Sequence, residues 1–472
     1  MAARKYLGGL AAVAFALAVA PAGAVSDTER VTIYKQFLAD YQAKRYAEAQ
    51  PLAEQLVKLT EEQYGPDELQ LTNPLTNLAT IHYKLGNYPA AIENYQRTLR
   101  IMQAKSTNAD KQQIRPLHGL GVSFLAAHEP EAAVVALKRA ADLSRNNDGL
   151  FNIGQIEFID ALIDAYEATG RYPESEKEAG YALRVEEAAY GRTSVKLLDR
   201  LDKLARWFEN DRRYTSERNT YERSLAILQK SGANDDLRRI PPLRGIARSF
   251  RLEAFYGIEG ADNGATFNAG NNGAPVFSDG SQQRRGESSL TAALAIIDSV
   301  QPTDNLLRGE VLTDLGDWYL VANNTRRAYD TYAEAWKSLT DARDTKLLEW
   351  PRVLAYRPSV SSVDRSQLDP KEAQLKAVEL HFTVTRDGRL DNVSSPTTDV
   401  PEGIVRNSVA SMRRSRYAPR IENGAAVATN DVVFIERVLI RVTSSESGTS
   451  SGKAEEKPPE PPAPDPKEEP KK

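Results

Sequence analysis

The sequence predicts a mainly helical fold class: an array of paired helices followed by a small α+β domain near the C-terminus. Apolar residues of matching size recur at a constant spacing, prolines stand where second helices should begin, and residues 377–385 alternate between apolar and polar side chains. A long constant spacing is typical of helical repeats, whereas a period of two is typical of a strand. The alternation falls after the repeats, so the two patterns predict separate domains.

The first 24 residues form a segment of their own. Arg4 and Lys5 precede an apolar run at 7–20, and small residues at 22–24 follow it. This order is that of a secretory signal peptide at 1–24, cleaved after Ala24. The run is shorter than the roughly 20 residues that a bilayer span needs, and no later stretch is apolar enough to replace it. We therefore expect no membrane span after cleavage.

The composition argues against nucleic-acid binding and, with the signal peptide, favours the periplasm. The chain has 472 residues, 41% hydrophobic and 27% charged, a length that suggests two to four domains. Removal of the signal peptide changes the formal net charge from −4 to −6, and a mildly acidic chain binds nucleic acid poorly. The chain has no cysteine, which in an exported protein favours the periplasm over a eukaryotic secretory route.

A period of 42 residues runs through most of the chain. One unit carries Leu78, Ala79, His82, Gly86, Tyr88, Ala91, Tyr95 and Leu99. Steps of 42 residues reach similar sets at 120–141, 162–183 and 204–225, and one step back reaches Lys44, Tyr46 and Ala49. The spacing predicts five successive units with the same internal structure.

Each unit is predicted to be two antiparallel helices. Large residues fill the space between the helices, while small ones such as Ala79, Gly121 and Ala205 allow close approach. The second helix opens with a proline in three units, at Pro89, Pro130 and Pro173. A proline suits the first helical turn because no amide hydrogen bond is lost there.

These units resemble the tetratricopeptide repeat (TPR), in the longer form found in kinesin light chains. The resemblance covers 30–343 and implies about seven units stacked as a right-handed superhelix. The sixth unit begins on schedule and is interrupted by a Gly/Asn-rich insertion at 257–283, and a seventh follows it. The insertion either touches a ligand, with Asp262 and Asp279 as calcium candidates, or is a disordered interruption. We favour the second interpretation because its acidic residues lack a regular ligand spacing.

The resemblance implies that the first helices line a concave face that binds peptides. Three positions per first helix are expected there, and their character changes along the array. The aromatic end has Tyr34, Leu38 and Tyr41, followed by Thr76, Thr80 and Tyr83; the acidic part has Asp160, Asp164 and Glu167, then Asp202, Arg206 and Glu209; the basic end has Arg244, Arg248 and Arg251. We expect Tyr34, Tyr41, Asp160 and Asp164 to contact a partner.

The arginine row at 244, 248 and 251 allows two interpretations. Arginines at one-turn spacing can hold a carboxylate by paired charge-assisted hydrogen bonds. Alternatively, they neutralise acidic positions of the neighbouring unit. The hypothesis is that the three arginines form a subsite for an anionic ligand.

After a predicted linker at 344–375, the pattern becomes that of an α+β domain. A strand over 377–385, a tight turn at Asp387-Gly388 and a helix over 401–415 precede further strands, with a second turn at Asn423-Gly424. The basic stretch "RRSRYAPRIENGAAV" at 413–427 marks the junction from helix to strand. Arg416 and Arg420 within it are candidate partner contacts.

The domain at 376–443 resembles the C-terminal domain of TonB. The resemblance rests on the motif from Phe382 to Gly388, the Arg416-Tyr417-x-Pro419 motif, the Asn423-Gly424 turn and the closing strand. It implies docking of an extended peptide on a sheet edge, with 432–442 as the candidate strand. TonB keeps its N-terminal membrane helix and has a Pro-rich spacer before the domain. Here the signal reads as cleavable, and the Pro/Glu/Lys-rich stretch at 444–472 reads as a disordered tail.

The sequence offers no set of catalytic or metal-binding residues. Four histidines are scattered, and no nucleophile elbow, phosphate loop or zinc motif is present. We therefore expect no enzyme, no cofactor and no metal. The leading interpretation is a periplasmic scaffold that binds proteins or peptides, including envelope proteins or outer-membrane receptors. The alternatives are a TonB-type energy transducer or accessory for receptor transport and, more distantly, a cell-wall enzyme with an unrecognised site.

Overall fold

The computed structural model describes residues 24–105, 111–232, 236–257, 277, 280–356, 358–359 and 373–441. Residues 1–23 of the expected signal peptide, most of the Gly/Asn-rich insertion and the expected tail lie outside these residues. The chain divides into two compact units. The helical unit comprises Met1–Phe267 and Phe277–Asp304, and the C-terminal unit comprises Asn268–Val276 and Asn305–Lys472.

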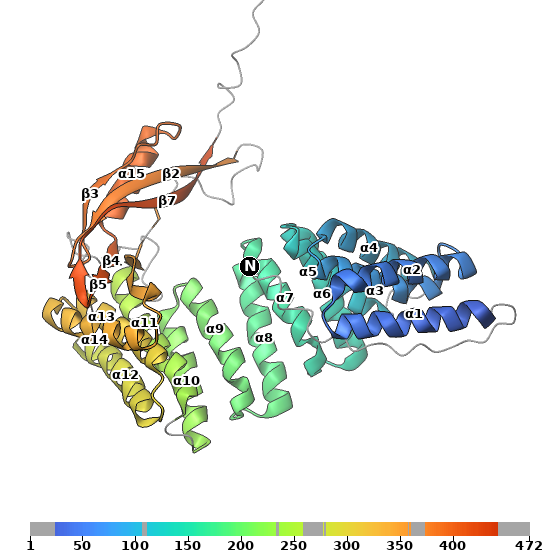
Figure 1. Ribbon diagram of the computed structural model, residues 1–472, viewed down its shortest axis with the longest axis horizontal. Coiled ribbons are helices and arrows are strands. Elements are labelled where there is room, and N and C mark those ends of the chain that lie inside the picture. Colours follow the sequence, from blue (N-terminus) through green and yellow to red (C-terminus); the bar gives the residue numbers. More distant parts are fainter. Residues whose placement is uncertain are drawn as a thin grey trace, which may run out of the picture. The chain divides into compact units, whose positions relative to one another are not determined.

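The helical unit is built from helical pairs that follow one another in chain order (Figure 1). The first helices are α1 (Ala24–Gln42), α3 (Thr72–Lys84), α5 (Ile114–Ala126), α7 (Ile156–Ala168), α9 (Leu198–Asn210) and α11 (Ile240–Tyr256). The second helices are α2 (Tyr46–Tyr64), α4 (Tyr88–Lys105), α6 (Pro130–Asp148), α8 (Tyr172–Tyr190), α10 (Tyr214–Lys230) and α12 (Gly280–Ser299). First and second helices of a pair pack against each other throughout.

The period of 42 residues is confirmed at the level of helix boundaries. From α3 to α11 every first helix begins 42 residues after the previous one, and a short 3₁₀ turn precedes each start. Pro130 begins α6, and the other two predicted prolines stand in the first turns of α4 and α8. In the sixth pair α11 continues to Tyr256 and packs on α12 across the interruption. The helix α12 begins at Gly280, inside the range predicted for the insertion.

Glycines let the helices of adjacent pairs approach closely. A Cβ at Gly119 of α5 would lie 2.2 Å from the ring of Tyr95 on α4, and one at Gly245 of α11 would lie 2.2 Å from the ring of Tyr221 on α10. The two contacts are 126 positions apart in the chain, which is three repeats. The packing of a tyrosine ring against a glycine of the next helix therefore recurs along the array.

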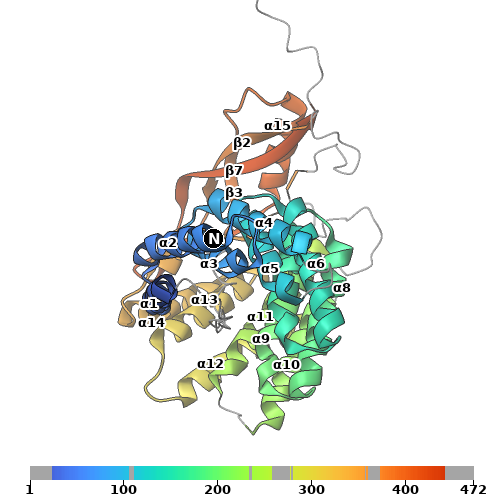
Figure 2. The same cartoon turned by 90° about the vertical axis from the view of Figure 1, so that its right-hand side faces the viewer.

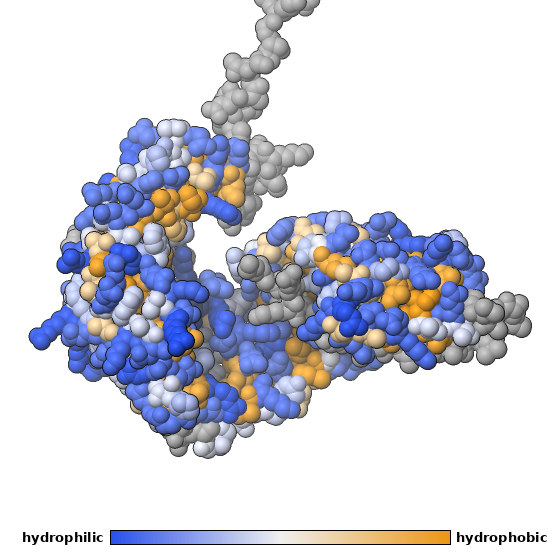
Figure 3. Space-filling model, in the orientation of Figure 1, coloured by the Kyte–Doolittle hydropathy of each residue, from blue (hydrophilic) through white to orange (hydrophobic). Residues whose placement is uncertain are grey.

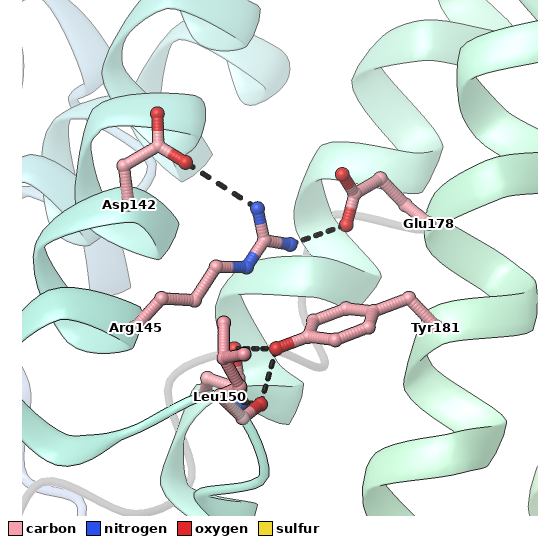
Figure 4. Close-up of polar contacts among 6 residues, drawn as sticks. Asp142, Arg145, Leu150, Glu178 and Tyr181 are labelled. Carbon is pink, nitrogen blue, oxygen red and sulfur yellow. Dashed lines mark hydrogen bonds and ion pairs between the residues drawn. The ribbon is translucent and has the colours of Figure 1, made fainter.

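A side-chain clamp joins the third and fourth pairs (Figure 4). Arg145 of α6 contacts Asp142 at 3.3 Å and reaches across to Glu178 of α8 at 2.5 Å. The hydroxyl of Tyr181 on α8 donates a hydrogen bond to the backbone carbonyl of Leu150. The clamp fixes the connection between the pairs because it holds both the helices and the loop that links them.

The C-terminal unit combines one helical pair with a small sheet region. The pair is α13 (Asn305–Val321) and α14 (Thr325–Asp341), and it is followed by the 3₁₀ turn η7 (Lys346–Leu348). The remaining elements are β1 (Arg352–Ala355), β2 (Ala373–Val384), β3 (Leu390–Ser394), α15 (Glu402–Arg413), β4 (Arg416–Ala418), β5 (Arg420–Glu422), β6 (Ala425–Val427) and β7 (Thr429–Arg441). The passage 344–375, expected to be a linker, thus contains η7, β1 and the start of β2.

The main sheet has three antiparallel strands in the order β3-β2-β7. The helix α15 covers one face of it, where Val405, Val409 and Met412 pack with Val378, Leu380 and other alternate residues of β2. This is the face that the alternation in the sequence predicts to be buried. Two further ladders, β1 with β4 and β5 with β6, are short. Sequence reasoning did not anticipate β1, whose four residues are too few to show a pattern.

Both predicted turns form. Between β2 and β3, Gly388 has a φ of +76°, and between β5 and β6, Asn423 and Gly424 have φ of 51° and 77°. Two successive positive φ values are those of the primed turns that fit antiparallel hairpins. The second turn lies on α14, where a Cβ at Gly424 would be 3.6 Å from the Cα of Ala333. The stretch around Asn423-Gly424 therefore joins the sheet region to the last helical pair.

A buried ion pair strengthens that junction. Arg352 of β1 contacts Asp317 of α13 at 2.7 Å, and the same carboxylate oxygen accepts a hydrogen bond from Tyr332 at 2.7 Å. Asp317 is almost fully buried. Because a buried carboxylate is costly unless it is paired, this contact ties β1 to the helical pair.

Candidate peptide-binding face of the helical unit

The candidate site is the first-helix face, which we define by residues 34, 38 and 41 of α1 and their equivalents at steps of 42 in α3 to α11. Each position is one helical turn from the next, so each first helix contributes one continuous strip. Five of these first helices, α1, α3, α5, α9 and α11, are labelled in the second view of the cartoon (Figure 2). The character of the strip changes along the unit, as the sequence indicates.

Acidic positions in the fourth pair are neutralised by the fifth. Asp160 of α7 contacts Arg200 and Lys203 of α9, each at 2.5 Å. Arg200 also contacts Glu186 of α8 at 2.9 Å. Asp164 likewise has an interaction partner within the chain. The acidic strip is therefore engaged in contacts between pairs.

The basic positions of the sixth pair also have interaction partners within the protein. Arg248 of α11 contacts Glu209 of α9 at 2.7 Å and approaches the buried carboxylate of Glu217 on α10 to 3.9 Å. Arg244 and Arg251 also have interaction partners within the chain. The arrangement of Arg248 matches the alternative interpretation of the arginine row, in which these charges neutralise a neighbouring unit.

The aromatic end of the face differs. Tyr34, Leu38 and Tyr41 of α1 are half-buried and pack on the core of the first two pairs. Tyr34 and Tyr41 both flank the ring of Phe37, with centroids 6.2 and 6.0 Å away. On α3 the Thr80 hydroxyl lies 2.9 Å from the hydroxyl of Tyr95. Apolar and hydroxyl groups dominate here, with no acidic residue among the counted positions of α1, α3 and α5.

Arg115 stands in this aromatic region and was missed by sequence reasoning. It lies one turn before His118, the first counted position of α5, and counting a fourth position per helix would have included it. The described residues give its guanidinium no hydrogen bond and no ion pair, and its Nε is buried. Burial lowers the pKa of Arg115, and electrostatic interactions with Tyr95, Tyr41 and Tyr34 oppose this shift.

His118 is the second unsatisfied group on this part of α5. Its side chain is 5% exposed, and the described residues provide no hydrogen-bond partner for its Nε2. Burial lowers the pKa of His118 to about 4, so the imidazole is neutral at neutral pH. Its ring meets that of Phe158 on α7 edge-on, with centroids 5.0 Å apart.

The C-terminal candidates occupy different environments. Arg416 of β4 is buried, with 7% of its surface exposed, and burial lowers its pKa. It is therefore not on the accessible surface of this unit. Arg420 of β5 is half-buried and contacts Glu422 at 2.9 Å. Neither is part of the first-helix face.

The strand β7 lies at an edge of the three-stranded sheet, because β2 is its only partner there among the described residues. Its outward-facing Val433 and Ile435 are 49% and 50% exposed, and Leu375 on β2 is 57% exposed. Apolar surface on the sheet of this unit is visible in the space-filling view (Figure 3). An exposed edge with apolar side chains is suited to pairing with another strand.

Other site types find little support among the described residues. They contain no group of three or more His, Asp or Glu side chains placed to hold a metal ion. His381 contacts Glu379 at 2.6 Å on the surface of β2. None of the described helices combines the length and the hydropathy that crossing a membrane requires.

Comparison with known proteins defines the class. The paired helices at constant spacing are those of a helical-repeat protein. Residues 38–104 and 75–146 match the family model of the tetratricopeptide repeat, so this part of the chain consists of TPRs, which typically mediate protein–protein interactions. No curated protein sequence matches the chain.

Several solved structures resemble the chain. A variant of putative kinesin light chain TPR-like repeats from Podospora anserina has 16% identity and a TM-score of 0.40, covering 43% of this chain and 96% of its own. The apo form of RapI has 13% identity and a TM-score of 0.37, with coverages of 67% and 99%. The apo form of the quorum sensor NprR from B. thuringiensis has 12% identity and a TM-score of 0.37, with coverages of 67% and 84%.

Proposed function

We propose that the protein is a non-catalytic interaction scaffold of the periplasm, whose first-helix face binds a peptide or protein segment. The observation that supports it most is the aromatic end of that face. Its Tyr34, Leu38 and Tyr41 are half-buried on α1, whereas Asp160 and Arg248 further along the face are engaged in ion pairs between helices. Rigid aromatic surface with nearby hydroxyls is typical of binding hot spots.

Site-specific crosslinking tests this function, and the absence of cysteine makes it simple. A single cysteine at Leu38→Cys would be labelled with a benzophenone maleimide. The matched control is Val135→Cys on α6, where the native side chain is 72% exposed. In intact cells we expect discrete adducts from position 38 and none from position 135. Equal labelling at both positions, or no adduct at 38, would refute the function.

Export to the periplasm is part of the same proposal. It is supported by the order of basic, apolar and small residues in 1–24 and by the absence of cysteine. N-terminal sequencing of the protein recovered from the periplasmic fraction should give Val25 as the first residue. A retained N-terminus in the membrane fraction would instead favour the alternative of a TonB-type transducer.

The C-terminal sheet is proposed to dock a second partner by strand addition, as its resemblance to the TonB C-terminal domain implies. The tight turn at Gly388, the helix α15 over one sheet face and the exposed edge of β7 support this proposal. Envelope proteins or outer-membrane receptors are the proposed partners. A crosslinker on Ile435→Cys should capture a protein partner, and the same label on the opposite edge, at Asp391→Cys of β3, should not. Capture from both edges would argue against specific docking on β7.

A further inference from the structure

The unpaired arginine on α5 narrows the kind of ligand that the first-helix face would take. Every other strongly charged position described above on this face has a partner inside the protein. Among the described residues Arg115 has no hydrogen-bond or ion-pair partner, although its Nε is buried and it interacts electrostatically with tyrosines of α1 and α4. A half-buried guanidinium without a counter-charge is destabilising, because its desolvation is not offset by an ion pair.

We infer that Arg115 is the anchor of a subsite for an acidic side chain, a Glu or Asp within an extended peptide bound to the first-helix face. This inference rests on the proposed function of the face. The planar guanidinium fork matches one carboxylate bidentately, and such a contact is strong where water is partly excluded. The ligand's carboxylate would supply the counter-charge that the described residues do not provide.

The surroundings of Arg115 define the rest of the ligand. Tyr34 and Tyr41 present half-buried rings on α1, and Leu38 lies between them in the same strip. These groups favour apolar or aromatic residues beside the acidic one. His118, one turn further along α5, is buried and neutral, so it adds no second charge. The proposed subsite therefore has one positive charge, that of Arg115, beside the aromatic side chains of α1.

A peptide array tests the ligand class directly. The probes are N-acetylated, C-amidated octapeptides in pairs that differ only by Glu or Gln at one position, with Leu, Phe or Ala beside it. The amide blocks the terminal carboxylate, so any preference reports the side chain. For the full-length protein we expect the best Glu peptides to bind at least about tenfold more tightly than their Gln partners, or about 1.4 kcal/mol.

Two variants separate binding from folding. Arg115→Gln should abolish the preference for Glu over Gln while leaving the melting temperature unchanged or higher, since an unpaired half-buried charge is removed. The matched control Arg100→Gln replaces an exposed arginine on α4 and should change neither quantity. A clear loss of stability in Arg115→Gln would show that the arginine has a structural role and overturn the inference.

The outcomes also distinguish this inference from the proposed function. Peptides that bind the first-helix face equally well with Glu and Gln would overturn the acidic subsite and leave the scaffold intact. Complete absence of peptide binding would overturn both. Unchanged preference in Arg115→Gln would place the recognition of the carboxylate elsewhere and refute the role of Arg115.

Discussion

At the scale of single residues, the turns between the two helices of a pair carry a repeated strain. The equivalent positions at 44, 86, 128, 170 and 212 all have positive φ, between 59° and 82°. Only Gly86 and Gly170 are glycines, while Lys44, His128 and Arg212 adopt the same conformation with a side chain. The left-handed region disfavours residues with a Cβ, so three turns are less stable than the other two.

Replacing the strained residues with glycine should stabilise the helical unit. We expect Lys44→Gly and His128→Gly each to raise the free energy of unfolding by about 0.5–1 kcal/mol, the relief of strain being partly offset by the flexibility of glycine in the unfolded chain. Both side chains are exposed, so little packing is lost. Urea denaturation measures the change. Gly170→Ala is the reverse control and should destabilise; a stabilised alanine variant would contradict the account.

A second residue-scale feature is the carboxyl of Glu217 on α10, which is fully buried beside Glu209. Burial and the neighbouring carboxylate raise its pKa to about 9 from 4.5. The folded state therefore binds the proton more tightly than the unfolded state does. Because the unfolded state loses this proton at a lower pH, the free energy of unfolding falls progressively as the pH rises from about 4.5 to about 9.

Glu217→Gln should remove that pH dependence, because an amide cannot ionise. We expect the variant to be more stable than the native chain at pH 8 and nearly equal to it at pH 5, as measured by urea unfolding followed by circular dichroism. The control Glu222→Gln lies on the same helix, where the carboxylate is exposed and contacts Arg285 at 2.7 Å. Its unfolding curve should keep the native pH slope. Identical slopes for all three proteins would rule out the assigned role of Glu217.

At the scale of elements, the turn between β2 and β3 shows why the Asp-Gly motif is informative. Gly388 has a positive φ, and a Cβ there would lie 2.0 Å from the backbone oxygen of Tyr417. The backbone of Tyr417 in turn donates a hydrogen bond to the carbonyl of Gly388 at 3.1 Å. The glycine thus serves both the hairpin and the contact between this turn and β4.

Gly388→Ala should destabilise the C-terminal unit by about 2 kcal/mol or more, since the methyl group meets backbone that cannot easily move. The matched control is Gly403→Ala in α15, where nothing lies within 4 Å of the added Cβ. Alanine favours the helix there and should stabilise by up to about 1 kcal/mol. Thermal unfolding of both variants measures the two changes in stability. Similar effects of the two substitutions would show that the turn is not constrained as described.

The accuracy of the sequence predictions also depends on the element. The 42-residue period predicted the helical pairs because Leu, Tyr and small residues at fixed offsets report packing between neighbouring helices. The strand β1 and the junction made by Arg352 and Asp317 were not predictable, because they depend on residues 35 positions apart with no shared pattern. Periodicity detects local packing, whereas such contacts depend on the tertiary fold.

At the scale of the whole molecule, the chain joins a TPR array to a sheet region that shares a compact unit with one helical pair. The aromatic, acidic and basic order of the counted first-helix positions can be read from the repeat. Which charges are neutralised cannot, since pairing such as Arg248 with Glu209 depends on the geometry between units. The same geometry leaves Arg115 without an ion pair among the described residues. The repeat pattern by itself allows a subsite for an anionic ligand at Arg244, Arg248 and Arg251, or their neutralisation of a neighbouring unit.

Hydrogen–deuterium exchange of the full-length protein, with and without a saturating peptide selected on the array, tests the central claim most directly. If the first-helix face of the first three pairs binds the peptide, protection should concentrate in α1, α3 and α5. The second helices α4 and α6 should show little change. Protection confined to second helices, to 373–441, or spread evenly over the chain would contradict the assignment of the binding face.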